Sequence, residues 1–320
     1  MKIGIFSIKY GMGGTERVTN NLVKYLKTKH DVEVLLWKHI RIPPFDNIWL
    51  LPLSYLNKQE YDVYFNLVFG GSLFASKLFE KPIVHYFHKP PLENPRLIEK
   101  IGFTPILALE KMHKYLKYIP TACNSKYTQK KIKEFYNISP KVIYPPVNTK
   151  KFKPSKRRKK FILMTGRITP FKKYEKILNF MNHKEVIIAG FLPEDSINYY
   201  MFLRRRFPKV KFRLNVSEKD LIKLYQECKI YIFPNPEEHF GIVPFEAMAC
   251  GKTVLIPEGC GASELIRDGK NGYLFKNDYS NFQEKLNEAL NSDVGKKARK
   301  SIEKTLSIED FGKKMFELIS

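Results

Sequence analysis

Two successive runs of alternating strand and helix patterns constrain the fold of this 320-residue chain more than any other feature. In the first run, short apolar segments stand at 2–8, 32–37, 63–67 and 83–87. After Gly14, apolar residues recur at helical spacing, with Thr15 as a candidate helix cap. The second run begins at Phe161 and continues to about residue 280. Alternation of this kind predicts doubly wound parallel sheets with ligands at the carboxyl ends of the strands.

The segment between the two runs is rich in proline and then in positive charge. Eight of the eleven residues from 150 to 160 are Lys or Arg. Prolines stiffen a connection and charges keep it solvated, which is typical of a domain boundary. We therefore predict an N-terminal domain over 1–150 and a second domain over 151–303. A C-terminal helix at 304–320 is a candidate to pack back on the N-terminal domain.

Composition places the chain among soluble globular proteins, with 43% hydrophobic and 28% charged residues. No segment has the pattern of a secretory leader, and the apolar runs are too short to span a bilayer. The four cysteines show no C-x-x-C spacing, which indicates reduced thiols and neither a zinc site nor a disulfide framework. We expect a cytoplasmic protein.

The net charge of +24 predicts attraction to polyanions, which include nucleic acid, an anionic membrane surface and phosphorylated substrates. A second basic cluster stands at Arg204–Arg206. The chain has no recognisable module that interleaves basic and aromatic residues, so we rank nucleic acid below the other partners. The segment Arg96–Tyr118 mixes apolar and basic residues. It fits a helix on an anionic membrane and a helix packed on the first domain equally well.

The segment from 236 to 251 gives the strongest indication of function in the sequence. Gly241 permits a tight turn, and Pro244 suits the first turn of a helix. Glu238 then lies in the entering loop and Glu246 about one turn inside the helix. The free N–H groups at a helix start attract anions such as phosphate. Two acceptors for sugar hydroxyls beside a diphosphate cradle predict a pocket for a nucleotide sugar.

Two further loops carry residues suited to a diphosphate. Arg167 follows a predicted strand and Lys172 comes five residues later, so that a rigid fork of donors and a compact charge meet at a strand end. Gly13 and Gly14 follow the first strand, where the absence of side chains permits close backbone approach and fits a tight strand-to-helix turn equally well. Two serines, Ser125 and Ser217, stand where they would cap the helices that follow them.

Together these motifs resemble the family-4 retaining glycosyltransferases, whose signature is Glu-x7-Glu. The resemblance runs from about residue 3 to 280 and is strongest over 161–275. It implies the GT-B fold, in which two Rossmann-like α/β domains face a central cleft. By resemblance, Glu238 lies beside the transferred sugar as a catalytic residue and Glu246 holds the ribose hydroxyls of the nucleotide.

The same resemblance assigns the other site residues. Arg167 and Lys172 neutralise the leaving diphosphate, although Lys173 replaces the usual glycine and leaves open which lysine makes the contact. His88, which fits the family better than His85, touches the donor sugar near the reaction centre. The donor diphosphate is also held by backbone around Gly13, Gly14, Phe240, Gly241, Ile242 and Val243. His239 replaces a common glycine and leaves the identity of the sugar open.

The implied reaction is transfer of a hexosyl group from a UDP-, GDP- or ADP-sugar to a hydroxyl of a carbohydrate, a lipid-linked glycan or a protein glycan. No Asp-x-Asp follows an apolar strand, so we expect metal-independent transfer without a cofactor. Location on the inner face of a membrane is left open. The alternatives are a glycoside hydrolase that uses Glu238 and Glu246, and a basic protein that binds nucleic acid or a membrane surface.

Overall fold

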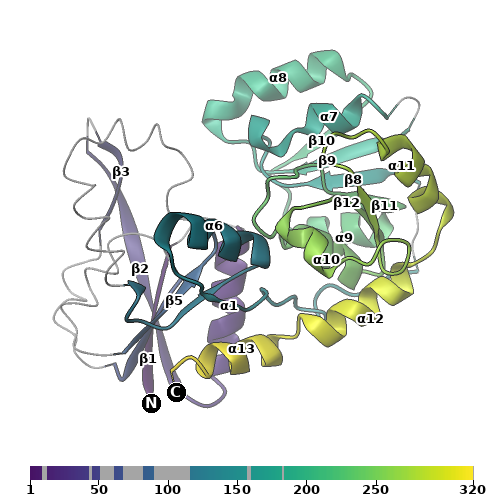
Figure 1. Ribbon diagram of the computed structural model, residues 1–320. Coiled ribbons are helices and arrows are strands. Elements are labelled where there is room, and N and C mark those ends of the chain that lie inside the picture. Colours follow the sequence, from purple (N-terminus) through teal and green to yellow (C-terminus); the bar gives the residue numbers. More distant parts are fainter. Residues whose placement is uncertain are drawn as a thin grey trace. The chain divides into compact units, whose positions relative to one another are not determined.

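The computed structural model (Figure 1) describes residues 1–8, 13–42, 45–50, 61–67, 82–89, 116–156, 160–181 and 184–319. The chain divides into two compact units. Unit 1 comprises Met1–Pro146 and Ile308–Ser320, and unit 2 comprises Val147–Ser307. Most of the segment 96–118, for which the sequence predicts a helix either on a membrane surface or packed on the first domain, lies outside the described residues.

Unit 1 contains a seven-stranded sheet with the order β3-β2-β1-β4-β5-β6-β7. The strands are β1 (Lys2–Ile8), β2 (Asp31–Ile42), β3 (Phe45–Leu50), β4 (Val63–Asn66), β5 (Ile83–Phe87), β6 (Thr121–Cys123) and β7 (Lys141–Val142). Only β3 is antiparallel to its neighbour. Every side chain of β4 and β5 is buried, as expected for central strands of a sheet that is covered on both faces.

Among the described residues of unit 1, three helices pack on this sheet, namely α1 (Gly14–Leu26), α6 (Lys126–Tyr136) and α13 (Ile308–Phe316). The buried stripe of α1 and two residues of α13, Phe311 and Met315, join one apolar core with β1, β4 and β5. Gly312 lets α13 approach α1 closely, because a Cβ atom there would lie 2.1 Å from the ring of Tyr25. The C-terminal helix therefore completes the core of unit 1.

The predicted helix caps have mixed outcomes. The hydroxyl of Ser125 accepts a hydrogen bond from the N–H of Thr128 at 3.0 Å, and α6 begins at the next residue, Lys126. The cap predicted at Thr15 is wrong, because α1 already begins at Gly14 and Gly13 precedes it without a side-chain cap. Glycine supports this helix start because it carries no side chain that could compete with the backbone.

Unit 2 contains a six-stranded sheet in which all neighbouring strands are parallel, with the order β10-β9-β8-β11-β12-β13. The strands are β8 (Ile162–Thr165), β9 (Val186–Gly190), β10 (Lys211–Leu214), β11 (Ile230–Ile232), β12 (Thr253–Pro257) and β13 (Tyr273–Phe275). Strand order reverses between β8 and β11. Open sheets of this kind bind ligands at the reversal, outside the carboxyl ends of the two strands.

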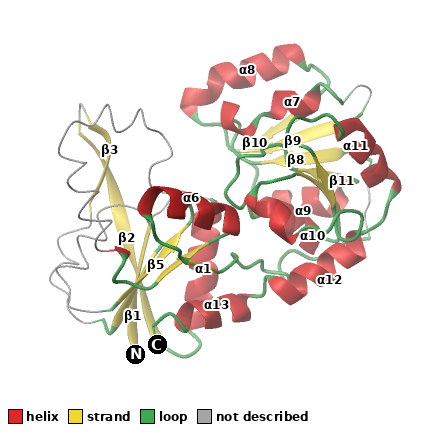
Figure 2. Cartoon of the chain, in the orientation of Figure 1, coloured by secondary structure: helices red, strands yellow, loops and turns green. Residues whose placement is uncertain are grey.

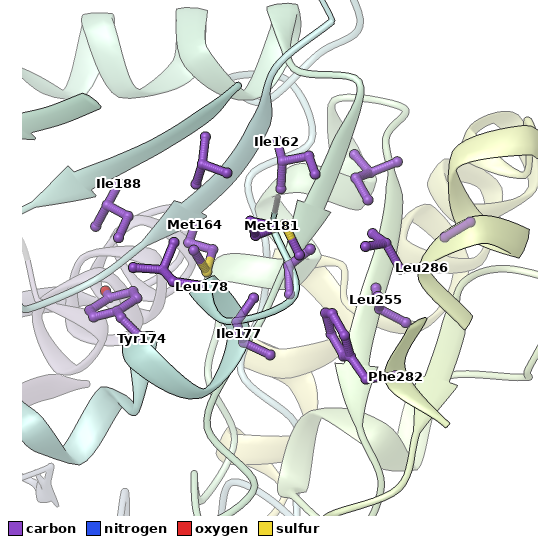
Figure 3. Close-up of a cluster of buried hydrophobic side chains, with 14 of the residues drawn as sticks. Ile162, Met164, Tyr174, Ile177, Leu178, Met181, Ile188, Leu255, Phe282 and Leu286 are labelled. Carbon is purple, nitrogen blue, oxygen red and sulfur yellow. The ribbon is translucent and has the colours of Figure 1, made fainter. Parts of the chain in front are cut away.

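Helices cover both faces of this sheet (Figure 2). One face carries α7 (Tyr174–Leu178), α8 (Ile197–Arg206) and α11 (Phe282–Asn291), and the other carries α9 (Glu218–Glu227), α10 (Val243–Ala249) and α12 (Gly295–Thr305). Figure 3 shows the core on the first face, where Met164 of β8 and Leu255 of β12 lie among side chains of α7 and α11. Ser217 caps α9 as predicted, since its hydroxyl accepts from the N–H of Asp220 at 3.1 Å.

Both units are Rossmann-like α/β folds, as the alternating sequence pattern predicted. The structure adds elements that the pattern did not predict. Among the described elements, the antiparallel strand β3 and the helix α12 are the two largest of these additions.

Candidate active site

The predicted charged residues of unit 2 follow the two strands that flank the reversal of strand order. Arg167 and Lys172 come after β8, and Glu238 comes after β11. Strands β8 and β11 are hydrogen-bonded neighbours, with Leu163 opposite Tyr231. The carboxyl ends of parallel strands lie at one edge of a sheet, so the fold directs both loops to the same place.

Lys172 and Glu238 form a direct ion pair between Nζ and Oε2. Their side chains are only 12% and 19% exposed, so both charges are largely removed from water. The ammonium group also lies over the rings of Phe171 and Phe233, at 5.7 and 5.8 Å from the ring centroids. An ion pair in such surroundings is screened less than a surface pair. The structure thus brings together two residues predicted from motifs 66 positions apart.

Lys173 occupies a different position from Lys172. Its Nζ pairs with Glu237 at 2.9 Å, and the Glu237 side chain is 60% exposed. The backbone of Lys173 is left-handed, with φ of 53°. Glycine adopts this conformation without the steric cost that other residues carry. The residue that replaces the family glycine therefore retains the glycine conformation, and it is Lys172 that contacts Glu238.

Arg167 is exposed at the end of β8, and within the described ranges it makes no ion pair. The backbone around it is tightly constrained. A Cβ atom on Gly190 would lie 1.8 Å from the carbonyl oxygen of Gly166, so the ends of β8 and β9 touch through backbone alone. Arg167 therefore extends, from a fixed point of the chain, a guanidinium group that forms no ion pair with a described residue.

The loop that carries Glu238 turns into α10 at Gly241, where φ is 70°. A Cβ atom there would lie 2.5 Å from the ring of Phe233, so only glycine fits. Within the described part of the chain, the N–H groups of Gly241, Ile242 and Val243 donate no hydrogen bond. These N–H groups at a helix start favour an anion. Phe240, also predicted at the diphosphate, is 2% exposed and its ring stacks on Phe245 at 4.8 Å.

A second close backbone contact supports the loop that carries Glu238. The N–H of Gly261 donates to the carbonyl oxygen of Glu238 at 3.0 Å. A Cβ atom on Gly261 would lie 1.7 Å from the carbonyl oxygen of His239, so the two backbones pass without room for a side chain. Gly261 was not predicted from the sequence, although its position beside the apolar strand β12 is a signal that could have identified it.

Glu246 lies deeper than expected for a residue that contacts a nucleotide, because only 1% of it is exposed. Its Oε2 accepts a hydrogen bond from the hydroxyl of Tyr225 at 3.2 Å. Thr165 Oγ1 lies 3.0 Å from this hydroxyl and 3.1 Å from that of Tyr231. Burial raises the pKa of Tyr231 well above its ordinary value, so this phenol stays neutral. The hydroxyl cluster of Thr165, Tyr225 and Tyr231 was not predicted.

The corresponding strand ends of unit 1 carry neutral polar groups. His85 of β5 is 1% exposed, and its Nδ1 lies 2.7 Å from the amide nitrogen of Asn66 in β4. Burial lowers the pKa of His85 to about 3. The ring is therefore neutral near pH 7 and accepts the amide hydrogen bond at Nδ1, since an amide nitrogen only donates.

His88 follows the same strand, and its ring packs edge-on against Tyr86 at 5.1 Å. Its carbonyl oxygen accepts from the side-chain amide of Asn124 at 2.6 Å, which fixes the backbone at this point. Burial lowers the pKa of His88 to about 4, so this imidazole is also neutral near pH 7. Gly13 and Gly14 lie at the start of α1 in the same unit. No group of three His, Cys, Asp or Glu side chains among the described residues is arranged to hold a metal.

Comparison with known proteins agrees with this geometry. Residues 147–306, half of the chain, match the family model of glycosyl transferases group 1. The chain is 24% identical over 305 residues to the alpha-1,3/1,6-mannosyltransferase ALG2 of Dictyostelium discoideum, covering 77% of this chain and 71% of the relative. It is 25% identical over 327 residues to an uncharacterized glycosyltransferase of Methanocaldococcus jannaschii, covering 92% and 89%.

The fold is similar to that of Anabaena HepE, solved in complex with UDP-glucose, with a TM-score of 0.78. This likeness covers 99% of this chain and 98% of the other at 18% identity, so it bears on the fold alone. Glu238, Glu246 and Arg167 all lie within the residues that the family model matches. The chain belongs to the glycosyl transferases group 1 and is a glycosyltransferase of the GT-B fold.

Proposed function

We propose that this glycosyltransferase moves a hexosyl group from a nucleoside-diphosphate sugar to a hydroxyl acceptor, with retention of anomeric configuration and without a metal ion. The observation that carries the proposal is the ion pair of Lys172 with Glu238, at the reversal of strand order in unit 2. A cation beside a carboxylate offers one group for a phosphate and one for sugar hydroxyls.

In this proposal the donor diphosphate lies between Arg167, Lys172 and the N–H groups of Gly241, Ile242 and Val243. A bound phosphate competes with Glu238 for the ammonium group of Lys172. As Lys172 turns toward the phosphate, Glu238 becomes available to accept hydrogen bonds from sugar hydroxyls. The ion pair therefore holds both side chains in position before the donor binds. When the donor binds, the contact between the two side chains is replaced by a contact from Lys172 to the phosphate and one from Glu238 to the sugar hydroxyls.

We assign the nucleotide ribose to Glu246. This carboxylate is almost fully buried, so the ribose reaches it only if a neighbouring side chain moves aside. Tyr225 would then keep the carboxylate oriented through the hydrogen bond that it already donates. In unit 1, we assign His88, Gly13 and Gly14 to the donor sugar and diphosphate, as the family resemblance implies.

The chemical step breaks the bond between the anomeric carbon and the diphosphate oxygen, and the electron pair remains on that oxygen. The acceptor oxygen forms the new bond on the same face of the sugar, and its proton leaves with the diphosphate. Negative charge grows on the leaving oxygen while the sugar acquires oxocarbenium character. Arg167 and Lys172 stabilise the first charge and Glu238 the second, and this electrostatic term is the main contribution to the rate.

Metal independence follows from the same charges, because Arg167 and Lys172 supply the positive charge that a divalent cation supplies elsewhere. We expect transfer activity to be unchanged by EDTA and not increased by added Mg²⁺ or Mn²⁺. Loss of activity in EDTA with recovery on addition of one of these ions would contradict this part of the proposal.

The donor is found by a thermal-shift screen followed by a transfer assay. A ligand that binds only the folded state raises the melting temperature, so UDP-, GDP- and ADP-hexoses are compared directly. UDP-glucose and GDP-mannose are tested first, because one structural neighbour was solved with UDP-glucose and one relative is a mannosyltransferase. Proton NMR of the product should show an α linkage from an α-configured donor. A β linkage would contradict retention.

The rival hydrolase reading requires Glu238 and Glu246 to face each other across a glycosidic bond. The burial of Glu246 and its hydrogen bond to Tyr225 argue against such a role. Cleavage of an oligosaccharide without any nucleotide, lost in both glutamate variants, would favour the hydrolase.

A further inference from the structure

The helix α8 of unit 2 exposes apolar side chains to an unusual degree. Of its ten residues only Leu203 is buried. Ile197 is 54% exposed, Met201 41% and Phe202 48%, and Phe191 shortly before the helix is 57% exposed. Single apolar residues on a surface need no explanation, but a group of this size marks an interaction site.

Three consecutive arginines, Arg204, Arg205 and Arg206, form the last turn of the same helix, and all are exposed. Arg205 falls between Met201 and Phe202 around the helix axis, given 3.6 residues per turn. These three residues, with Asn198 and Arg206, line a shallow depression of the surface. The exposed face of α8 therefore interleaves apolar side chains and guanidinium groups.

None of the three arginines forms an ion pair with a residue that the structure describes. Instead, the guanidinium carbon of Arg204 lies 5.9 Å from the ring centroid of Tyr200, and that of Arg206 lies 6.0 Å from the ring centroid of Phe207. Aromatic rings hold the cations in place without neutralising them. The positive charge of α8 is thus available to an external anion.

We propose that this α8 surface, formed by Phe191 and Ile197–Arg206, binds the surface of an anionic lipid bilayer. Apolar side chains enter the boundary between head groups and acyl chains, while guanidinium groups bind the lipid phosphates. The net charge of +24 adds long-range attraction to such a surface. Among the described residues no helix is long and apolar enough to cross a membrane, so attachment through α8 is peripheral.

The α8 surface is connected to the donor loop by direct hydrogen bonds. The hydroxyl of Tyr199 in α8 accepts from the N–H of Tyr174, at the start of α7, at 3.1 Å. The carbonyl oxygen of Phe191 accepts from the N–H of Ile168 at 2.8 Å. Binding through α8 therefore holds the loop of Arg167 and Lys172 near the lipid surface. This inference goes beyond the proposed reaction and does not require it.

The test is flotation of the full chain with vesicles of phosphatidylcholine, with and without phosphatidylglycerol, in the absence of donor and acceptor. The triple substitution Arg204→Gln, Arg205→Gln, Arg206→Gln should weaken binding to the anionic vesicles about 100-fold at low salt. The matched control is Lys296→Gln, Lys297→Gln, Lys300→Gln on α12, which lies at the opposite end of unit 2 (Figure 1). This control removes the same charge from three exposed residues and should weaken binding less than about fivefold.

A second pair of variants tests insertion of apolar side chains. Met201→Ser with Phe202→Ser should abolish the binding that persists at high salt, whereas Phe135→Ser, at a residue of α6 that is 54% exposed, should not. Equal weakening by the two charge variants would overturn the proposal, because only the net charge would then matter. Arginine-dependent binding to a DNA oligonucleotide, with vesicle binding unchanged in the arginine variant, would overturn it in favour of nucleic acid.

Discussion

Unit 1 and unit 2 contain similar sheets, but the candidate site residues of the two units differ in charge. In unit 2 the loops after β8 and β11 carry full charges, with Lys172 paired to Glu238 and Arg167 unpaired within the described ranges. In unit 1, His85 lies within β5 and His88 follows its last residue, and burial lowers the pKa values of the two histidines to about 3 and about 4. One sheet edge presents ions, and the other presents neutral rings.

This difference teaches how one fold used twice can divide the recognition of a charged sugar donor. In the function that we propose, the diphosphate needs positive charge, and the switch point of unit 2 would supply it. Sugar hydroxyls need neutral donors and acceptors at fixed positions, and we assign this role to the imidazole of His88, which is neutral near pH 7.

The largest expected effect comes from the carboxylate of Glu238. We expect Glu238→Ala to lower the transfer rate by about 10³-fold, because an electrostatic contact to the transition state is lost. Nucleotide affinity should fall only slightly in this variant and more strongly in Glu246→Ala. Glu237→Ala, at the exposed neighbouring glutamate, is the matched control and should stay near the wild-type rate. Wild-type transfer rates in both the Glu238 and Glu246 variants would refute the site assignment.

The second-largest expected effect is a pH dependence of the free energy of unfolding, caused by the neutral His85. The pKa of His85 is lower in the folded state than its ordinary value of 6.5, so the unfolded chain binds the proton first. The contribution of His85 to stability is complete above pH 6.5 and falls as the pH decreases, by about 2 kcal/mol at pH 5. It levels off near the folded pKa of about 3.

Urea unfolding at several pH values measures this effect. Tryptophan fluorescence reports on the unfolding of unit 1, because Trp37 and Trp49 both belong to it. Glutamine in the variant His85→Gln keeps an acceptor for Asn66 but does not titrate. The number of protons taken up on unfolding, given by the pH dependence of the free energy of unfolding, should therefore fall by about one. An unchanged pH dependence in this variant would show that His85 is not held neutral.

A smaller effect is expected from the hydroxyl cluster under Glu246. Tyr225→Phe removes the hydrogen bond to the Glu246 carboxylate without changing the packed ring. We expect nucleotide affinity to fall about tenfold, since a hydrogen bond to a charged group contributes roughly 1.5 kcal/mol or more. Tyr231→Phe is the control, because the Tyr231 hydroxyl meets Thr165. Equal losses in both variants would mean that the cluster acts on stability alone.

The smallest effect concerns the left-handed backbone of Lys173. Lys173→Gly should raise the free energy of unfolding of unit 2 by about 1 kcal/mol, since glycine adopts this conformation without strain. Its exposed pair with Glu237 contributes little, so the gain should survive. Transfer activity should not change. Lys172→Gly should instead reduce activity strongly, and equal activity of the two variants would refute the distinct roles of these lysines.

Much of this organisation could be predicted from the sequence where the signal is local. Ser125 and Ser217 cap helices through residues three positions away, and the strands of both units are short apolar runs. Lys172 and Glu238 could be predicted to meet because each follows a strand of a parallel sheet. Thr15 failed as a cap because Gly13 and Gly14 permit an earlier helix start.

The remaining features depend on contacts that no local pattern encodes. Thr165, Tyr225 and Tyr231 lie on three different elements, and only the folded sheet brings their hydroxyls together. Gly261 is required by the carbonyl oxygen of His239, 22 residues earlier, which approaches it through space. The burial of Glu246 likewise follows from the packing of α10 and not from its spacing to Glu238.

The central claim is that fixed positive charge in unit 2 holds a donor diphosphate. Isothermal titration in EDTA measures it directly, with the nucleoside diphosphate found in the screen, the wild-type chain, the double variant Arg167→Gln, Lys172→Gln, and Lys173→Gln as control. We predict saturable binding that weakens at least about 100-fold in the double variant and about threefold or less in the control. Wild-type affinity in the double variant would contradict the account.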